Sequence, residues 1–177
     1  MRRFRAGGRM WFRKHEMKSI AAIAVLTLAM SETGSTQEKY AGPRPPKPDL
    51  PYLVHADNLE PTEAAEAKEE QVKDLVVYAI AGVACAAKTP LAGPIFLIQT
   101  EKLEAEKVEL YRMDVKNGRR QVAFSKKKPK DSARPIRLEV SRLDEKLFRI
   151  EVQESLDVGE YSLTPSGSNQ VFCFQVY

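Results

Sequence analysis

Residues that commonly bind metal ions or transfer protons are scarce in this sequence. It has only two histidines and two cysteines among 177 residues. A zinc site needs three or four nitrogen, sulfur or oxygen ligands at suitable spacing, and the sequence shows no such set. We therefore expect the protein to hold no metal ion and no cofactor.

Short signatures of common catalytic sites are also missing. No Gly-x-Ser-x-Gly segment marks a hydrolase nucleophile, and no glycine-rich loop suits a phosphate. His55 lies in a short apolar segment, where a solvated or packed histidine is the favoured interpretation. The sequence therefore favours a protein that is not an enzyme. The alternative is a hydrolase that uses His55 or an unrecognised pair of carboxylates.

The apolar run of residues 20–30 (IAAIAVLTLAM) is too short to span a membrane. It has eleven residues, whereas a spanning helix needs about 20. Lys18 precedes it and Ala29-Met30-Ser31 closes it, which is the pattern of an export signal cut before Glu32. We expect residues 1–31 to be a signal peptide, with translation starting at Met17. The protein would then be periplasmic or extracellular, and would contact the membrane only through the uncleaved leader.

Excess positive charge is confined to this leader. Residues 1–31 hold seven of the 28 Lys and Arg residues but one of the 24 Asp and Glu residues. The chain from residue 32 onward therefore has 21 basic and 23 acidic residues, a net charge of −2. This balance gives no support to nucleic acid as a partner.

One segment precedes the predicted folded domain, and a second segment lies near the start of that domain. Residues 32–51 are polar and then rich in proline, which favours extended backbone, so we expect a tether there and a folded domain over residues 52–177. Residues 60–74 (EPTEAAEAKEEQVKD) are rich in strong helix formers and have Pro61 where a first helical turn accepts it. We predict a short, solvated helix near residues 61–73.

Strand patterns dominate from Leu75 onward. The short apolar runs of residues 75–80 and 95–99 favour buried strands. Asn117-Gly118 then predicts a hairpin, because both positions of its turn need positive φ. The predicted pairs, from the turn outward, are Lys116–Arg119, Met113–Val122 and Tyr111–Phe124.

A second hairpin is expected around the turn Asp144-Glu145-Lys146. A three-residue loop keeps apolar residues of both strands on one face, whereas a two-residue loop would place Val140 opposite Arg149. The other face is polar, as in an antiparallel sheet that packs on one side. The predicted pairs are Leu143–Leu147, Val140–Ile150 and Leu138–Val152.

The segment from Asp157 to Tyr161 has the pattern Asp-x-Gly-x-Tyr, with Gly159 at its centre. This pattern resembles the tyrosine corner of immunoglobulin-like sandwiches, in which the tyrosine hydroxyl bonds back to the backbone. The resemblance implies a mainly β fold, an antiparallel sandwich of about seven strands. Leu163 stands where the second cysteine of antibody-type domains lies, so their inter-sheet disulfide is absent. The C-terminal sequence also resembles small exported bacterial proteins of unassigned function.

Cys85 and Cys173 become able to pair if the protein is exported to an oxidising compartment. Strand alternation places Phe172 and Phe174 on one face of the last strand and Cys173 on the other. A loop over residues 81–94 that covers this second face would bring Cys85 to it. The disulfide would close a long loop and contribute about 3–5 kcal/mol in the entropy model. The alternative is two buried, unpaired thiols.

A lysine-rich segment lies between two predicted strands at residues 125–131 (SKKKPKD), close in sequence to Arg119 and Arg120. These side chains would contact anionic surfaces of a cell envelope, such as polymer phosphates or lipid headgroups. The alternative is a solvated loop that protects a sheet edge from aggregation. The four lysines are Lys126, Lys127, Lys128 and Lys130.

Taken together, these patterns predict an exported, non-enzymatic interaction or structural module of the bacterial cell envelope. Its partner would be an unidentified envelope protein or an anionic envelope polymer. A binder of anionic envelope surfaces through the lysine-rich segment is the first alternative function, and the hydrolase is the second.

Overall fold

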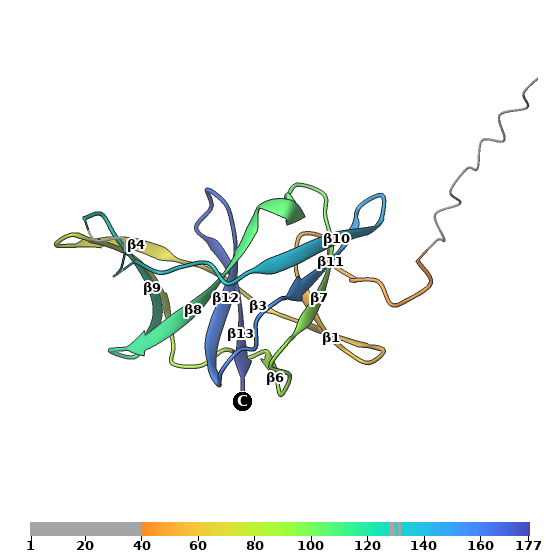
Figure 1. Cartoon of the computed structure of the whole chain (residues 1–177), viewed down its shortest axis with the longest axis horizontal. Helices are drawn as coiled ribbons and strands as arrows, with labels where there is room; N and C mark the ends of the chain where they lie inside the picture. Colours follow the sequence, from red (N-terminus) through yellow and green to blue (C-terminus); the bar gives the residue numbers. More distant parts are fainter. Residues whose placement is uncertain (1–39, 128–129, 131) are drawn as a thin grey trace, which may run out of the picture. The chain divides into compact units, whose positions relative to one another are not determined.

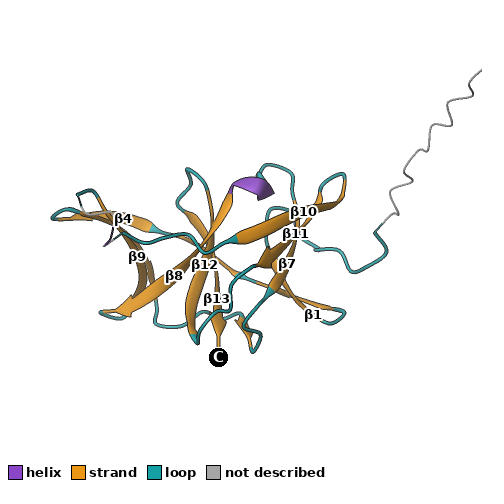
Figure 2. Ribbon diagram, viewed as in Figure 1, coloured by secondary structure: helices purple, strands orange, loops and turns teal. Residues whose placement is uncertain are grey.

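The computed structural model describes residues 40–127, 130 and 132–177 (Figure 1). The predicted signal peptide, the start at Met17 and the first part of the tether fall on residues 1–39, outside the described residues. Lys128 also lies outside them. The described chain folds mainly into strands that form two sheets (Figure 2). This confirms the predicted mainly β, antiparallel, two-sheet architecture.

The smaller sheet has five strands, and the apolar run of residues 95–99 supplies its central one. Every neighbouring pair in it is antiparallel. In spatial order its strands are β10 (Leu138–Asp144), β11 (Leu147–Val152), β7 (Ile95–Gln99), β1 (Tyr52–His55) and β2 (Asn58–Pro61).

The larger sheet has eight strands, of which the short β6 (Lys88–Thr89) pairs with the last strand in parallel. A short 3₁₀ helix, η1 (Ala105–Lys107), leads into this sheet and is purple in Figure 2. In spatial order the other strands are β3 (Glu63–Glu66), β13 (Gln170–Val176), β12 (Gly159–Pro165), β8 (Val108–Lys116), β9 (Arg119–Ser125), β5 (Leu75–Ala81) and β4 (Lys68–Val72).

The larger sheet curls until its two ends meet. Its end strands, β3 and β4, are consecutive in the chain and are separated only by Ala67, whose N–H donates to the Asn169 carbonyl at 2.8 Å. Strand β8 is shared in the same way, because its first part pairs with β12 and its last residues pair with β9 (Figure 1). The strand order therefore returns to its start, and the sheet forms a barrel.

Two hydrophobic cores follow from this arrangement. The sandwich core lies between the smaller sheet and the outer face of the barrel, with Phe96 and Phe174 packed edge to face at 5.0 Å between centroids. The barrel core lies inside the curled sheet and includes Met113 and Cys173. Phe172 and Phe174 belong to the first core and Cys173 to the second, so the predicted alternation along the last strand is confirmed.

The predicted helix near residues 61–73 is wrong, because this segment forms β3 and β4. Side chains alternate along it, and Ala65 and Ala67 pack into the barrel core. The strands β13 and β5 would otherwise expose unpaired backbone groups at their edges, and this segment pairs with both. Closure of the sheet therefore outweighs the helix propensity of alanine and glutamate.

The Asn117-Gly118 hairpin is confirmed near its turn. Both turn residues have positive φ, and Lys116 pairs with Arg119. The paired ladder ends at Asp114, because β8 then continues along β12 instead of β9. The predicted partners further out therefore do not pair through their backbones. The rings of Tyr111 and Phe124 nevertheless pack at 5.3 Å across the barrel interior.

The second hairpin has the predicted register except beside its turn. The pairs Leu138–Val152 and Val140–Ile150 are confirmed. The pair Leu143–Leu147 is wrong, because Asp144 is the partner of Leu147 and the register shifts between Arg142 and Asp144. A β-bulge thus absorbs one residue, which keeps the apolar side chains on one face with a shorter turn.

The described end of the predicted tether, residues 40–51, contacts the domain. Arg44 forms an ion pair with Asp144. Asp49 has φ +56° and accepts hydrogen bonds at its carboxylate from the backbone N–H groups of residues 101–103. Partial burial alone would raise the pKa of Asp49, but these donors lower it. The chain therefore enters the first strand from a fixed position.

Candidate functional site

A cavity of about 560 Å³ opens at the end of the barrel nearest the β12–β13 turn. Its wall comes from six strands of the larger sheet and from the turn at residues 166–169. We call it the barrel cavity. The lining residues that define its chemistry are Glu69, Tyr78, Glu109, Tyr111, Phe124 and Ser162.

Three aromatic rings line one part of the barrel cavity. The ring of Phe124 meets that of Tyr78 edge to face at 5.9 Å and that of Tyr111 at 5.3 Å between centroids. They lie on three neighbouring strands of the larger sheet, β5, β9 and β8. Edge-to-face contacts of this kind fix the orientation of each ring. The result is a preformed aromatic wall.

Two exposed carboxylates border this wall. The hydroxyl of Tyr111 donates to Glu109 at 2.8 Å, and that of Tyr78 donates to Glu69 at 3.2 Å. Burial and the neighbouring carboxylates raise the pKa of both tyrosines. The tyrosines therefore stay neutral near pH 7. The described lining of the cavity then includes two carboxylates and no lysine, arginine or histidine.

Ser162 is among the residues that line the barrel cavity, and its side chain is buried. Its side chain is 1% exposed, and among the described residues its Oγ has no hydrogen-bond partner. A buried hydroxyl without a partner costs about 1–3 kcal/mol, so such groups are rare in folded proteins. Among the described residues, the Ser162 Oγ is thus the buried side-chain polar atom that lacks a hydrogen-bond partner.

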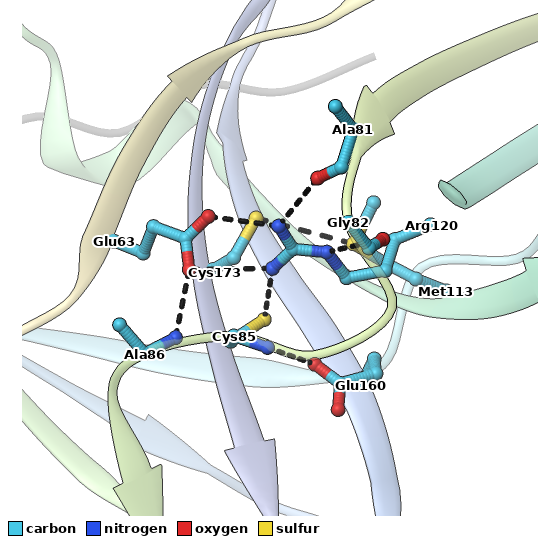
Figure 3. A network of polar contacts seen from close by, with 9 residues as sticks. All are labelled: Glu63, Ala81, Gly82, Cys85, Ala86, Met113, Arg120, Glu160 and Cys173. Carbon is cyan, nitrogen blue, oxygen red and sulfur yellow. Dashed lines mark hydrogen bonds and ion pairs between the residues drawn. The ribbon is translucent and has the colours of Figure 1, made fainter. Parts of the chain in front are cut away.

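The opposite end of the barrel is closed by Arg120, which is 2% exposed (Figure 3). Its guanidinium donates to Glu63 at 2.8 Å and to the Cys85 sulfur at 2.8 Å. It also donates to the carbonyl oxygens of Ala81 at 2.9 Å and Gly82 at 3.3 Å. One side chain therefore joins β9, β3 and the loop after β5.

Charge pairing sets the protonation of this closed end. Burial alone would lower the pKa of Arg120, but its interactions with Glu63 and Cys85 outweigh this effect and raise the pKa above its ordinary value. Partial burial alone would raise the pKa of Glu63, but hydrogen bonds from Arg120 and from the Ala86 N–H lower it. Both groups are charged at neutral pH, and they compensate each other.

The two cysteines lie in this end of the barrel core. The structure shows Cys85 and Cys173 as buried free thiols in one cluster (Figure 3). The covering loop thus brings them together as the sequence argument expected, while the disulfide itself stays a prediction. A hydrogen bond with Cys173, followed by burial, raises the pKa of the Cys85 thiol. The Cys85 thiol is therefore protonated near neutral pH, and both sulfurs are buried.

His55 links the two sheets. Its Nε2 lies 3.0 Å from the Thr89 hydroxyl and its Nδ1 lies 3.6 Å from a Glu60 oxygen. The order threonine, histidine, carboxylate resembles that of a nucleophile, its base and an orienting group. Thr89, however, is fully buried, and its hydroxyl also accepts from the Leu91 N–H. In this geometry the contact joins β1 to β6, and the hydrolase alternative gains no accessible nucleophile from it.

The lysine-rich segment is only partly described. Lys126, Lys127 and Lys130 are exposed, and Lys127 forms an ion pair with Asp74 at 2.9 Å. Arg119 pairs with Glu70, and Arg120 is buried in the barrel. Both arginines are thus paired with carboxylates, Arg119 with Glu70 on β4 and Arg120 with Glu63 on β3.

Tyr161 lies at the start of β12 and is almost fully buried in the sandwich core. Its hydroxyl donates to the Asp157 carbonyl oxygen at 2.8 Å. Arg112 donates to the Val158 carbonyl and forms an ion pair with Asp157 at 3.3 Å. A side chain at Gly159 would meet the Arg112 guanidinium at 3.3 Å, so the small residue leaves room for this arginine.

Sequence patterns alone do not single out the cavity residues, nor Arg120 and Glu63, as functional. Glu63 lies in a segment with helix-forming composition, and Arg120 follows a second arginine directly after the Asn117-Gly118 turn. The alternation of Arg120, Val122 and Phe124 on one face of a strand was the available signal. This alternation places the Arg120 guanidinium on the same face of the strand as the apolar side chains of Val122 and Phe124.

Two further findings concern the described residues, and a third concerns the whole sequence. They contain no cluster of three or more His, Cys, Asp or Glu side chains arranged to hold a metal ion. Within the same residues, no helix has the length and apolar content needed to cross a membrane. No protein-family model, no curated protein and no solved structure matches the chain.

Proposed function

We propose that this protein is an exported, non-enzymatic interaction module of the bacterial cell envelope that binds its partner in the barrel cavity. The observation that carries the proposal is the cavity itself. Its volume falls within the roughly 300–1,000 Å³ of ligand sites in proteins. It also combines an aromatic wall with a few polar groups, which is the usual composition of such sites.

An immunoglobulin-like relationship of the sandwich is part of this proposal. The hydrogen bond from Tyr161 to the Asp157 carbonyl supports it, because the tyrosine of a tyrosine corner bonds back to the backbone a few residues upstream. Asp157, Gly159 and Tyr161 would then have a structural role. In this view the sandwich holds the chain together, and the barrel presents the binding site.

The proposal is tested by nuclear magnetic resonance titration of the purified protein with a panel of small cationic, anionic and neutral aromatic compounds. We expect saturable shifts at the residues of the barrel cavity for at least one class. A Val76→Trp variant should abolish these shifts, because Val76 lines the cavity and a larger side chain would fill it.

The matched control is Val72→Trp, which introduces the same side chain at an exposed position of β4 that does not line the cavity. This variant should bind like the original protein. If no compound gives saturable shifts, or if Val76→Trp leaves them unchanged, the cavity is not the binding site and the proposal is wrong.

The lysine-rich segment is the second candidate for a binding function. The exposure of Lys126, Lys127 and Lys130 favours it, since these ammonium groups are accessible to an anionic surface. The ion pair between Lys127 and Asp74 weighs against it, because it neutralises one of the charges.

A further inference from the structure

We propose that the barrel cavity binds a small organic ammonium ion that has an apolar body and a hydroxyl group. This inference rests on the proposed function, since it names the class of ligand for the same cavity. Three independent features of the lining support it: its charge, its aromatic wall and the position of Ser162.

Charge at the cavity mouth selects a cation. Glu69 and Glu109 are exposed at the edge of the cavity, and the described lining has no basic side chain to balance them. Each accepts a tyrosine hydroxyl at its Oε2. A carboxylate can accept at both oxygens, so each retains capacity for an ammonium donor. An anionic ligand would be repelled by both groups.

The aromatic wall favours the same ligand. An ammonium group within about 6 Å of an aromatic centroid is attracted by the negative face of the ring. Tyr78, Tyr111 and Phe124 form three such rings beside the two carboxylates. Apolar side chains, among them Val122 and Val171, line the rest of the interior and suit the body of the ligand.

Ser162 explains why the ligand should have a hydroxyl group. Ser162 is one of the residues that line the cavity, and its buried Oγ has no partner among the described residues. A ligand hydroxyl that reaches Ser162 would supply the missing hydrogen bond. The exposed glutamates and the buried serine thus define two ends, with the ammonium group at the mouth and the hydroxyl group inside.

The test compares four small probes that share one aromatic body. Tyramine has an ammonium and a hydroxyl group, 4-ethylphenol lacks the ammonium group, 3-(4-hydroxyphenyl)propanoate has a carboxylate in its place, and phenethylamine lacks the hydroxyl. Dissociation constants for the purified protein are measured by calorimetry or magnetic resonance. Tyramine should bind about tenfold tighter than 4-ethylphenol. The carboxylate should bind weakest.

Variants that remove one negative charge test whether Glu69 and Glu109 bind the ammonium group. Glu69→Gln and Glu109→Gln keep the shape of each side chain and an oxygen for the tyrosine hydroxyl. Each should weaken tyramine about threefold and leave 4-ethylphenol unchanged. Glu66→Gln is the matched control, because Glu66 is an exposed glutamate on the same segment that does not line the cavity. It should leave tyramine binding unchanged.

Ser162→Ala tests the inner end of the site. Tyramine should lose about fivefold in affinity, whereas phenethylamine, which has no hydroxyl, should lose none. Because the Ser162 hydroxyl has no partner in the described fold, its removal should not destabilise the protein. Equal losses for the two probes would overturn the assigned orientation.

The outcomes separate this inference from the proposed function. If 4-ethylphenol or the carboxylate binds as tightly as tyramine, and Val76→Trp blocks that binding, the ligand class is wrong while the cavity remains a binding site. If tyramine does not bind although other compounds of the panel do, the ligand class is again wrong. If nothing binds in the cavity, both proposals fail.

Discussion

At the scale of single residues, Arg120 contributes most to the closed end of the barrel. A buried charge is stabilising only while its partners remain, because removal of one partner leaves the other uncompensated. Arg120 satisfies Glu63, the Cys85 sulfur and two backbone carbonyls at once. Its contribution should therefore far exceed that of an ordinary surface arginine.

We predict that Arg120→Met lowers the free energy of unfolding by about 3 kcal/mol. Urea unfolding followed by circular dichroism measures this change. Arg119→Met is the matched control, because this neighbour forms a partly exposed ion pair with Glu70. Such pairs contribute about 0–1 kcal/mol. Similar losses in the two variants would contradict the buried network.

The same pair gives the prediction a pH dependence. The pKa of Glu63 is lowered in the folded protein, so its contribution is present above about pH 4.3, the ordinary pKa of glutamate. It is lost as the pH falls through the lowered folded value. Glu63→Gln should therefore lower stability at pH 7 and flatten the acid limb of the stability profile. An unchanged acid limb would show that Arg120 does not hold this carboxylate.

At the scale of elements, the distance along the chain between paired strands decides which of them can be predicted from the sequence. Hairpin turns such as Asn117-Gly118 act locally, and the sequence predicted that turn and its first pair. Strand β3 depends on partners more than 100 residues away in the chain, whereas β4 pairs with β5 across the short turn at Lys73 and Asp74. No local pattern reports the distant partner of β3, so the alanines and glutamates of this segment suggested a helix.

The lysine-rich segment can be tested separately for its predicted binding to anionic surfaces. Binding to vesicles of phosphatidylglycerol and phosphatidylethanolamine is measured by sedimentation at low and high salt. Replacing its four lysines by glutamine should remove most of the binding, at about 1 kcal/mol per lysine near an anionic surface. Replacing them by arginine keeps the charge and serves as the control.

The ion pair of Lys127 sharpens this test. Asp74→Asn frees Lys127 and removes a nearby negative charge, so it should strengthen binding to the vesicles. Vesicle binding that survives in the glutamine variant would contradict a role for the loop. So would binding that does not respond to Asp74→Asn or to salt.

At the scale of the whole molecule, the sequence predicted the class of fold but not its division into a sandwich and a barrel. The described residues form thirteen strands rather than about seven, five in the smaller sheet and eight in the larger. The barrel cavity arises from that closure. Its residues come from six separate segments, so only the folded chain brings Glu69 and Ser162 to one site.

The last prediction concerns export and the two cysteines, which one measurement on the native protein can test together. Cells are fractionated without reductant, and the mass and N-terminal sequence of the recovered protein are determined. We expect a chain that begins at Glu32, in the periplasm or outside the cell, because residues 1–31 have the pattern of a cleaved signal. In that oxidising compartment Cys85 and Cys173, which share one buried cluster, should be joined.

The disulfide would make the protein lighter by two hydrogen atoms and would leave no thiol to react after unfolding. Cys173→Ser provides the control, since it leaves Cys85 as a free thiol and removes the link between the covering loop and the last strand. Two reactive thiols in the unfolded native protein would contradict the disulfide. An uncleaved chain in the cytoplasm would contradict export, and the two thiols would then remain as the structure shows them, buried and free in the barrel core.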